Sequence, residues 1–461
     1  MELISLWLDS RLRGNDKQVG EGVTTRGRMN RSLAVAIIAA FLLALIAPHA
    51  SAAPDSDLYQ PTPAEPGTDI PAAAVKFGMR PYADNTFYIV GIRKGWFKDV
   101  NITIEPEPEG LKVTDTNVTA LLLNGQLDLI SEYCPLMLPL YKTTRLLKCI
   151  AFTNNSIGTT ILANPKLKLK SFKDYAQSGM DFKQAIHAAL EPLQGKTLVG
   201  APELSQRPFE EVSSQLSGVT WKLQIMDDSK SLVLAKSAQI DFINPEGTPI
   251  VYMLKQSGWT DMLDNGDVVE HGPAGVDSPV ERLVGIVGMG ANADFVRGHA
   301  NTVLRFLSVV WRTMDAMKRD PSLFDIQAPY LNSVAGTSFD GKGVADVVNS
   351  LDPFAPFDYG ETFYNDAKSA RYYRNLYTAI IADYVAHNII PKDVVSPDQF
   401  IWGAAIWKQM NDYKSKTDAL LASVNGKSLP ADKQALVVKA RQYYGWFDYL
   451  DAFRFASAAA S

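Results

Sequence analysis

Polar, charged and aromatic side chains are concentrated in short segments that directly follow strand-like stretches or open helix-like ones. These segments are residues 80–87, 131–133, 153–156, 203–207 and 244–248. Ligands of open α/β sheets bind beyond the carboxyl ends of the strands, so we expect these segments to meet in one site. The candidate ligand-binding residues are Arg80, Tyr82, Asp84, Asn85, Phe87, Glu132, Tyr133, Asn154, Glu203, Arg207, Asn244, Glu246 and Thr248.

Carboxylates recur among these candidates. Helix N-termini by themselves attract negative groups through free N–H groups and the helix dipole. Acids placed at the same positions favour instead a ligand with nitrogen donors or a positive charge, and the aromatic candidates could stack on a planar ligand. The acids are Asp84, Glu132, Glu203 and Glu246, and the aromatic residues are Tyr82, Phe87 and Tyr133.

Two other interpretations of these charges stay open. The acids can cap their own helices and face water, and Arg80 and Arg207 can either pair with them or hold an anionic group bidentately. The expectation that an amine or a nitrogen heterocycle is bound in preference to sulfonate or nitrate therefore depends on the acids lining the site.

Signatures of catalysis and of metal binding are weak. The five histidines show no His-x-x-x-His spacing, and no Gly-x-Ser-x-Gly nucleophile elbow occurs. Two cysteines, Cys134 and Cys149, are too few for a thiolate zinc site. We therefore expect no catalytic residue, no metal and no cofactor. The alternative is an enzyme that uses Glu132 and Glu246 as acid and base.

The length and composition indicate how these residues are positioned. A chain of 461 residues with 46% hydrophobic side chains exceeds what one core holds, since single cores stop growing at roughly 250–300 residues. The net charge of −5 provides no basic excess for binding nucleic acid. Strand-like and helix-like stretches alternate over residues 75–152 and again over 197–256, where strands are expected at 197–200 and 222–225 and a helix at 248–256. This pattern predicts two α/β lobes with parallel sheets and a ligand cleft between them.

We predict lobe 1 over residues 75–157 and lobe 2 over 158–288, with extended crossover strands near 158–163 and 283–288. Residues 289–410 are predicted to form return helices that pack mainly on lobe 1, the first of them over 300–319. Residues 411–461 are predicted to be a helical extension, whose last helix covers 431–455.

The N-terminal region has the pattern of an export signal. A basic flank, Arg28 to Arg31, precedes an apolar run over residues 33–47, and Ala50-Ser51-Ala52 follows. That run is shorter than the roughly 20 residues of a membrane span, so residues 29–52 are predicted to be a signal peptide, cleaved after Ala52. An uncleaved membrane anchor is the alternative. We interpret residues 1–28 as a start-site artefact, and 53–74 as a flexible lead-in.

Four short motifs resemble a family of known proteins. They are Gly-Ile-Arg-Lys-Gly-Trp-Phe-Lys-Asp-Val-Asn-Ile at 91–102, Leu-Leu-Asn-Gly-Gln-Leu-Asp at 122–128, Leu-Gln-Gly-Lys-Thr-Leu-Val at 193–199 and Ala-Lys-Ser-Ala-Gln-Ile-Asp at 235–241. In this order they resemble the type II periplasmic binding proteins of the sulfonate, nitrate and thiamine-pyrimidine group, although Ala238 stands where that group has glycine. The resemblance covers roughly residues 75–410.

The resemblance implies a two-lobed fold that closes on a small molecule and delivers it to the permease of an ABC importer in the inner membrane. A periplasmic location and a monomeric state are expected with it. Besides the enzyme already named, a ligand-sensing partner of a membrane receptor is an alternative function.

Overall fold

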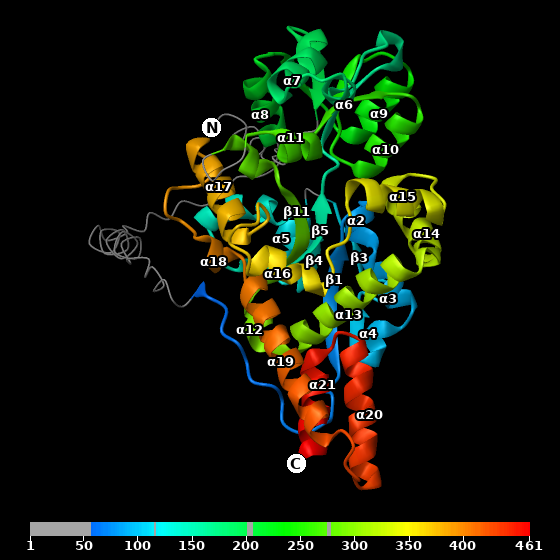
Figure 1. Cartoon of the computed structure of the whole chain (residues 1–461), viewed down its shortest axis with the longest axis vertical. Helices are drawn as coiled ribbons and strands as arrows, with labels where there is room; N and C mark the ends of the chain where they lie inside the picture. The colour runs from blue at the N-terminus through cyan, green and yellow to red at the C-terminus, as the bar shows by residue number, and fades with distance from the viewer. Residues whose placement is uncertain (1–56, 115–116, 201–205, 274–277) are drawn as a thin grey trace, which may run out of the picture. The chain divides into compact units, whose positions relative to one another are not determined.

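The computed structural model describes residues 57–114, 117–200, 206–273 and 278–461. Pro54–Ser461 form one compact unit, whose elements are labelled in Figure 1. The predicted signal peptide, the predicted start-site artefact and Glu203 lie outside the described residues.

The first sheet, called sheet 1, has the strand order β2-β1-β4-β11-β5, with β3 paired to β1. β1 is parallel to β2, β3 and β4, whereas β11 is antiparallel to β4 and β5. Its strands are β1 (Ala73–Met79), β2 (Ile102–Glu105), β3 (Leu111–Lys112), β4 (Leu129–Glu132), β5 (Leu147–Ser156) and β11 (Gly285–Asn292).

The second sheet, called sheet 2, has the order β10-β6-β9-β7-β8. β7 is parallel to β8 and β9, whereas β6 is antiparallel to β9 and β10. Its strands are β6 (Thr160–Ala163), β7 (Thr197–Gly200), β8 (Lys222–Ile225), β9 (Phe242–Asn244) and β10 (Thr260–Asp264).

Both sheets are mixed, so the expectation of wholly parallel sheets was wrong. In each sheet one strand opposes the rest, β11 in sheet 1 and β6 in sheet 2. These are the strands by which the chain enters one sheet from the other: β6 follows β5 directly, and β11 follows β10 after α11 (Asn265–His271). The alternation of strands and helices along the sequence did not reveal that the strand entering each sheet runs opposite to its neighbours.

Helices surround both sheets, and several have the predicted bounds. α10 and α13 begin and end at the predicted residues. The helices that contribute to or surround the site are α2 (Ala83–Thr86), α3 (Tyr88–Arg93), α8 (Arg207–Ser217), α9 (Asp228–Lys236), α10 (Thr248–Gln256), α11 (Asn265–His271), α13 (Ala300–Arg319), α15 (Gly341–Leu351) and α17 (Tyr373–Ala386). The others are α4 (Trp96–Asp99), α5 (Val118–Leu123), α6 (Phe172–Gln177), α7 (Phe182–Leu190), α12 (Ala293–Gly298), α14 (Phe324–Ala335), α16 (Gly360–Tyr364) and α18 (Pro397–Phe400).

Hydrophobic cores cover both sheets, and the largest of them extends across both. In sheet 1, Phe77 packs edge-on against Tyr88 of α3 and Phe306 of α13, with ring centroids 5.0 and 5.1 Å apart. The same cluster includes Leu162 of β6 and Ile243 of β9 in sheet 2. A further core of sheet 2 groups Leu198 and Phe209 with other buried residues of the helices around it, and Cys134 and Cys149 are free and buried within the sheet 1 side.

The C-terminal region consists of α19 (Gly403–Val424), α20 (Ala431–Gly445) and α21 (Tyr449–Ala460), which pack side by side (Figure 1). The single last helix that we predicted over 431–455 is therefore two helices. The break lies at Phe447, whose φ of 64° is left-handed and incompatible with a continuous helix.

The segment before β1, which we expected to be flexible, is bound to this C-terminal region. Tyr59 donates its hydroxyl to Gln409 at 2.8 Å. Arg454 donates to the carbonyl groups of Glu65 and Asp69 at 2.9 and 2.7 Å. Contacts far apart in sequence, which composition does not show, hold this segment in place.

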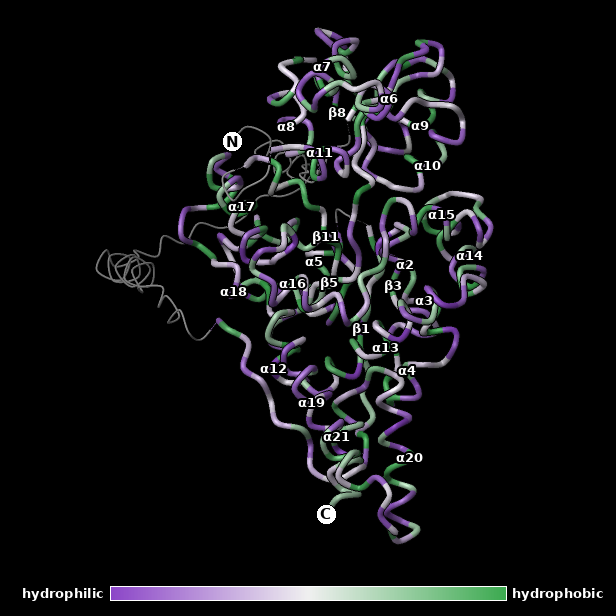
Figure 2. The backbone as a smooth tube through the Cα atoms, viewed as in Figure 1, coloured by the Kyte–Doolittle hydropathy of each residue, from purple (hydrophilic) through white to green (hydrophobic). Residues whose placement is uncertain are grey.

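Hydrophobic and hydrophilic residues alternate along the helices in Figure 2, as in helices with one buried face. Within the described ranges, none of the helices combines the length and the apolar character needed to cross a bilayer.

Candidate functional site

A pocket lies between the two sheets, with about 720 Å³ of empty space including its open mouth. Side chains from both sheets and from the crossover segments line it, and most are polar or aromatic. The lining residues are Arg80, Tyr82, Asp84, Asn85, Tyr133, Ser156, Thr159, Gln206, Pro208, Phe209, Glu246, Thr248, Asn265, Leu283, Gly285, Val287 and Asp352.

The strands place the predicted residues at the pocket as expected for strand ends. Arg80 directly follows β1, Tyr133 follows β4, and Glu246 follows β9. Thr248 is the first residue of α10, and Asp84 lies in the first turn of α2. The carboxyl ends of strands in both sheets therefore face the same space.

Arg80 connects the two sheets through charge-assisted hydrogen bonds. Its guanidinium donates to Glu132 of β4 at 2.7 Å and to Glu246 beyond β9 at 3.2 Å. It also lies 4.8 Å from the centre of the Tyr82 ring. Because Arg80 and Glu132 are 2% and 1% exposed, this ion pair is shielded from water and holds Arg80 in one orientation.

Asp84 and Asp352 are two buried acids among the residues that line the pocket. Burial raises the pKa of Asp84, which the Asn85 hydrogen bond and the Arg80 charge oppose. Burial also raises the pKa of Asp352 well above its usual value, and the charge of Asp84 raises it further. The hydroxyl groups of Thr248 and Ser156 lie beside Asp352, yet neither carboxylate oxygen has a hydrogen bond of standard geometry.

Other buried oxygen atoms at the pocket also lack a hydrogen-bond partner. They are Asn85 Oδ1, Gln206 Oε1, Thr248 Oγ1 and Asn265 Oδ1. The Asn265 amide nitrogen donates to the carbonyls of Ser156 at 3.2 Å and Leu283 at 3.4 Å, which turns its oxygen away from those groups. Since buried polar atoms in proteins are rarely without partners, these oxygens can accept hydrogen bonds from a ligand that has donors.

Seven of the predicted residues line the pocket: Arg80, Tyr82, Asp84, Asn85, Tyr133, Glu246 and Thr248. Glu132 is not among the lining residues, because it lies against Arg80 and accepts from the Tyr133 amide at 2.8 Å. Phe87 is a core residue stacked on Tyr88, with ring centroids 4.0 Å apart.

Two more predicted residues serve as structural supports. Asn154 donates to the carbonyl of Asp352 at 2.8 Å. Asn244 donates to the carboxylate of Glu210 at 3.0 Å. Both lie at strand ends as expected, but neither is among the residues that line the pocket.

Asp352 and Asn265 line the pocket but lie outside the candidate segments, whereas Gln206 lies within the segment 203–207 but was not among the candidate residues. Asp352 follows the C-terminus of α15, and Asn265 begins α11. The candidate segments adjoin strands of the two alternating regions, so an acid at the end of a return helix gave no signal. An acid immediately before proline and after an amphipathic helix, as in Leu351-Asp352-Pro353, is the only local feature at that position.

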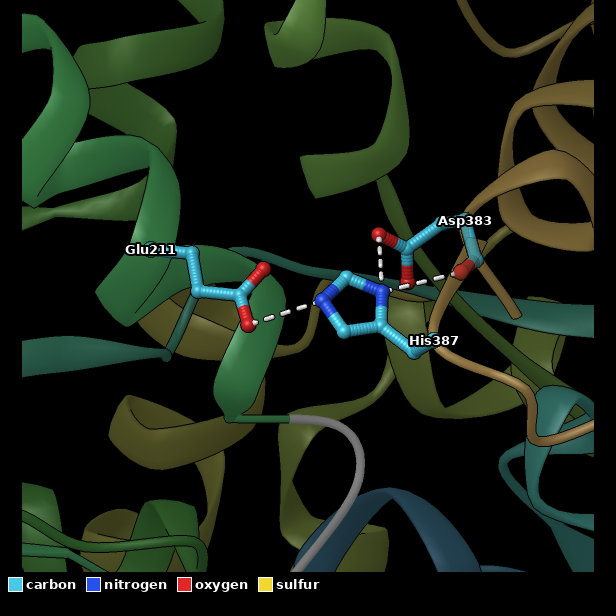
Figure 3. Close-up of side chains that lie close together, drawn as sticks. All are labelled: Glu211, Asp383 and His387. Carbon is cyan, nitrogen blue, oxygen red and sulfur yellow. Dashed lines mark hydrogen bonds and ion pairs between the residues drawn. The ribbon is translucent and has the colours of Figure 1, made fainter. Parts of the chain in front are cut away.

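Arg207 belongs to an ion-pair cluster with Glu211, Asp383 and His387. Figure 3 shows the His387 ring between the two carboxylates, a set of groups that could hold a metal ion. The Arg207 guanidinium, however, donates to Glu211 at 3.0 Å and to Asp383 at 2.5 Å, and lies 3.1 Å from His387 Nε2. It therefore already supplies the positive charge, and links α8 of sheet 2 to α17.

The sequence matches no known protein-family profile and no curated protein. Comparison of folds is informative. The periplasmic aliphatic sulphonate-binding protein SsuA from Escherichia coli superposes with a TM-score of 0.50 at 12% identity, over 73% of this chain and 100% of that one. The alkanesulfonate-binding protein SsuA from Xanthomonas axonopodis pv. citri, bound to MOPS, gives 0.49 at 13% identity, over 72% and 99%.

The fold is that of a type II periplasmic binding protein. The mixed sheets, the two crossover connections and the pocket between the sheets are consistent with this fold, which carries a C-terminal helical extension here. About a quarter of this chain has no counterpart in the Escherichia coli protein.

Proposed function

We propose that this chain is an extracytoplasmic solute-binding protein that captures a small nitrogen-containing organic molecule and delivers it to an ABC importer. The observation that carries the proposal is the pocket between the sheets, which takes lining residues from both of them. A ligand that contacts both sheets favours their approach by its higher affinity for the closed form.

Arg80 and its partners support a closing mechanism. Glu132 belongs to sheet 1, whereas Glu246 follows a strand of sheet 2, and one guanidinium contacts both. Tyr252 of α10 also donates to Asp346 of α15 at 3.2 Å, a second polar contact between the sheet 2 helices and the return helices. Such contacts form when the two sheets approach each other and break when the sheets move apart.

The lining charges support a ligand that supplies donors. Asp84, Glu246 and Asp352 line the pocket together with a single positive residue, Arg80, among the described residues. The unpartnered amide oxygens of Asn85, Gln206 and Asn265 accept hydrogen bonds only, whereas the Thr248 hydroxyl can also donate one. Small anions such as sulfonate or nitrate would meet like charges there, whereas an amine or a nitrogen heterocycle would not.

The enzyme alternative finds less support in the same geometry. Glu132 and Glu246 share one guanidinium, and Glu132 is held behind it, so the two carboxylates are not arranged as a separate acid and base across the pocket.

The proposed setting is the periplasm, after cleavage behind Ala52, with a monomeric protein and an inner-membrane permease as partner. A sensing role beside a membrane receptor would use the same pocket and differ only in the partner.

The test is ligand screening by thermal shift on protein that starts at Ala53. The panel contains organic amines, guanidines and aminopyrimidines, with polyols, alkanesulfonates and nitrate. A ligand at 100 times its dissociation constant stabilises the native state by about 2.7 kcal/mol, which raises the melting temperature by a few degrees. Thr159→Trp, which fills the pocket from a partly exposed position, should remove the shift.

Loss of the shift in the Thr159→Trp protein, with unchanged circular dichroism, would support the pocket as the binding site. Multiple-turnover chemistry that Glu246→Gln abolishes would overturn the proposal in favour of the enzyme. Shifts that persist in Thr159→Trp would show binding elsewhere.

A further inference from the structure

We propose that Asp352, supported by Asp84, is the subsite that binds a positively charged group of the ligand, such as an ammonium or an amidinium. This inference rests on the proposed solute-binding function and adds the residue that recognises the ligand's charge. Asp352 lies outside the segments that the sequence analysis selected, on the return from α15.

The position of Asp352 is fixed by backbone contacts to the crossover segment. Asn154 donates its side-chain amide to the Asp352 carbonyl at 2.8 Å. The amides of Asn155 and Ile157 donate to the carbonyls of Pro353 at 3.0 Å and Leu351 at 2.8 Å. These bonds flank Asp352 on both sides, so its carboxylate is held rigidly at the pocket wall, as a recognition group requires.

The Asp352 carboxylate is buried and lacks a well-formed hydrogen bond. The residue is 1% exposed, it lines the pocket, and neither oxygen accepts a hydrogen bond of standard geometry, although the hydroxyls of Thr248 and Ser156 lie beside it. An uncompensated buried carboxylate is unfavourable, and native proteins almost always pair such groups. The exception is explained if a ligand supplies the missing donors and the missing charge.

The Arg80 guanidinium donates to Glu132 and Glu246 at 2.7 and 3.2 Å, and its charge opposes the raised pKa of Asp84 but not that of Asp352. The other unpartnered atoms at the pocket are the amide oxygens of Asn85, Gln206 and Asn265 and the hydroxyl oxygen of Thr248. A cationic group with N–H donors satisfies the carboxylate and these oxygens together, which a neutral acceptor or an anion does not.

Binding of a cation should release a proton. In the empty pocket, burial and the charge of Asp84 raise the pKa of Asp352, and burial raises the pKa of Asp84, so the two acids retain a proton more readily than free carboxylates. A bound cation favours the ionised pair, and the displaced proton goes to solvent. The affinity for a cation therefore increases as the pH rises, until the empty pair is already ionised.

The test uses ethanolamine, guanidine and 4-aminopyrimidine as probes, with ethylene glycol and propanesulfonate as the neutral and anionic comparisons. Titration calorimetry in two buffers of different ionisation enthalpy gives both the affinity and the number of protons released. The variants are Asp352→Asn, which removes the charge at nearly constant shape, and Asp84→Asn. Asp358→Asn, an exposed acid six residues further along the chain, is the matched control.

We expect at least one of the cationic probes to bind with proton release. Asp352→Asn should weaken it by about 30-fold or more and abolish the release. Asp84→Asn should reduce the release with a smaller loss of affinity, and Asp358→Asn should change neither. The empty Asp352→Asn protein should melt no lower than the wild type, because the substitution removes an uncompensated buried acid.

Equal cation affinity in the wild type and in Asp352→Asn would overturn the Asp352 assignment and leave the solute-binding function standing. Binding of ethylene glycol or propanesulfonate in place of all three cations would overturn the charge class alone. If no compound of this set or of the wider screening panel binds, both the subsite and the proposed function are wrong.

Discussion

Glu210 is a buried acid beside the pocket wall, in the first turn of α8. Burial raises its pKa from 4.5 to about 7, the Asn244 hydrogen bond opposes this, and the charge of Glu211 adds to it. Between pH 4.5 and pH 7 the folded protein therefore retains a proton that the unfolded chain has already released. The contribution of Glu210 to stability is thus most favourable below pH 4.5 and is lost as the pH rises to 7.

Glu210→Gln should therefore stabilise the protein relative to the wild type at pH 8, by up to about 3 kcal/mol, and by much less at pH 4.5. Urea unfolding of both proteins at the two pH values measures this difference. Glu191→Gln, which neutralises an exposed acid outside α8, is the control. A Glu210→Gln advantage that does not grow between pH 4.5 and pH 8 would contradict the raised pKa.

Arg305 of α13 joins the return helices to the last helix of the chain. It donates to Asp451 of α21 at 2.7 and 3.0 Å, with side-chain exposures of 2% and 0%. The same guanidinium reaches Glu65, which is 29% exposed, in the segment before β1. Breaking a buried ion pair leaves an uncompensated charge, whereas an exposed pair contributes little.

Arg305→Met should therefore lower the free energy of unfolding by about 3 kcal/mol or more. Glu65→Gln, which removes the exposed partner of the same arginine, should cost less than about 1 kcal/mol. Chemical denaturation of the two variants gives the comparison. Equal losses would mean that the contact between α13 and α21 contributes no more than the surface pair.

The approach of the two sheets depends on contacts between helices that belong to different cores. Phe209 of α8 packs in the core of sheet 2, whereas Tyr377 of α17 packs with residues of sheet 1. Arg207 connects the two helices through Asp383, which is 3% exposed. Because hydrogen bonds between charged groups contribute roughly 1.5–3 kcal/mol, this single contact is large enough to change how often the sheets separate.

Asp383→Asn should shift the empty protein toward a more open form, with a larger radius of gyration in small-angle scattering. Asp358→Asn, which neutralises an exposed acid outside this cluster, is the control. It should leave the radius of gyration nearly unchanged. The same radius in both variants would show that the cluster does not hold the sheets together.

The local elements of this protein are determined by the sequence itself. β7, β8, α10 and α13 have the predicted bounds, because periodic burial and the residues that end helices are properties of short segments. For the same reason, polar residues directly after strands, such as Arg80 and Glu246, lie at the pocket as predicted.

Only the tertiary structure decides which of these residues remain available to a ligand. Glu132 and Arg207 have the same local pattern as Asp84, yet each is engaged in an ion pair that links distant segments. Asp352 reaches the pocket from the end of a return helix far along the chain. Burial and ion pairing depend on residues that are far apart in the sequence, so no local pattern contains them. For the same reason, the sequence did not reveal that β6 and β11 run antiparallel to their neighbours.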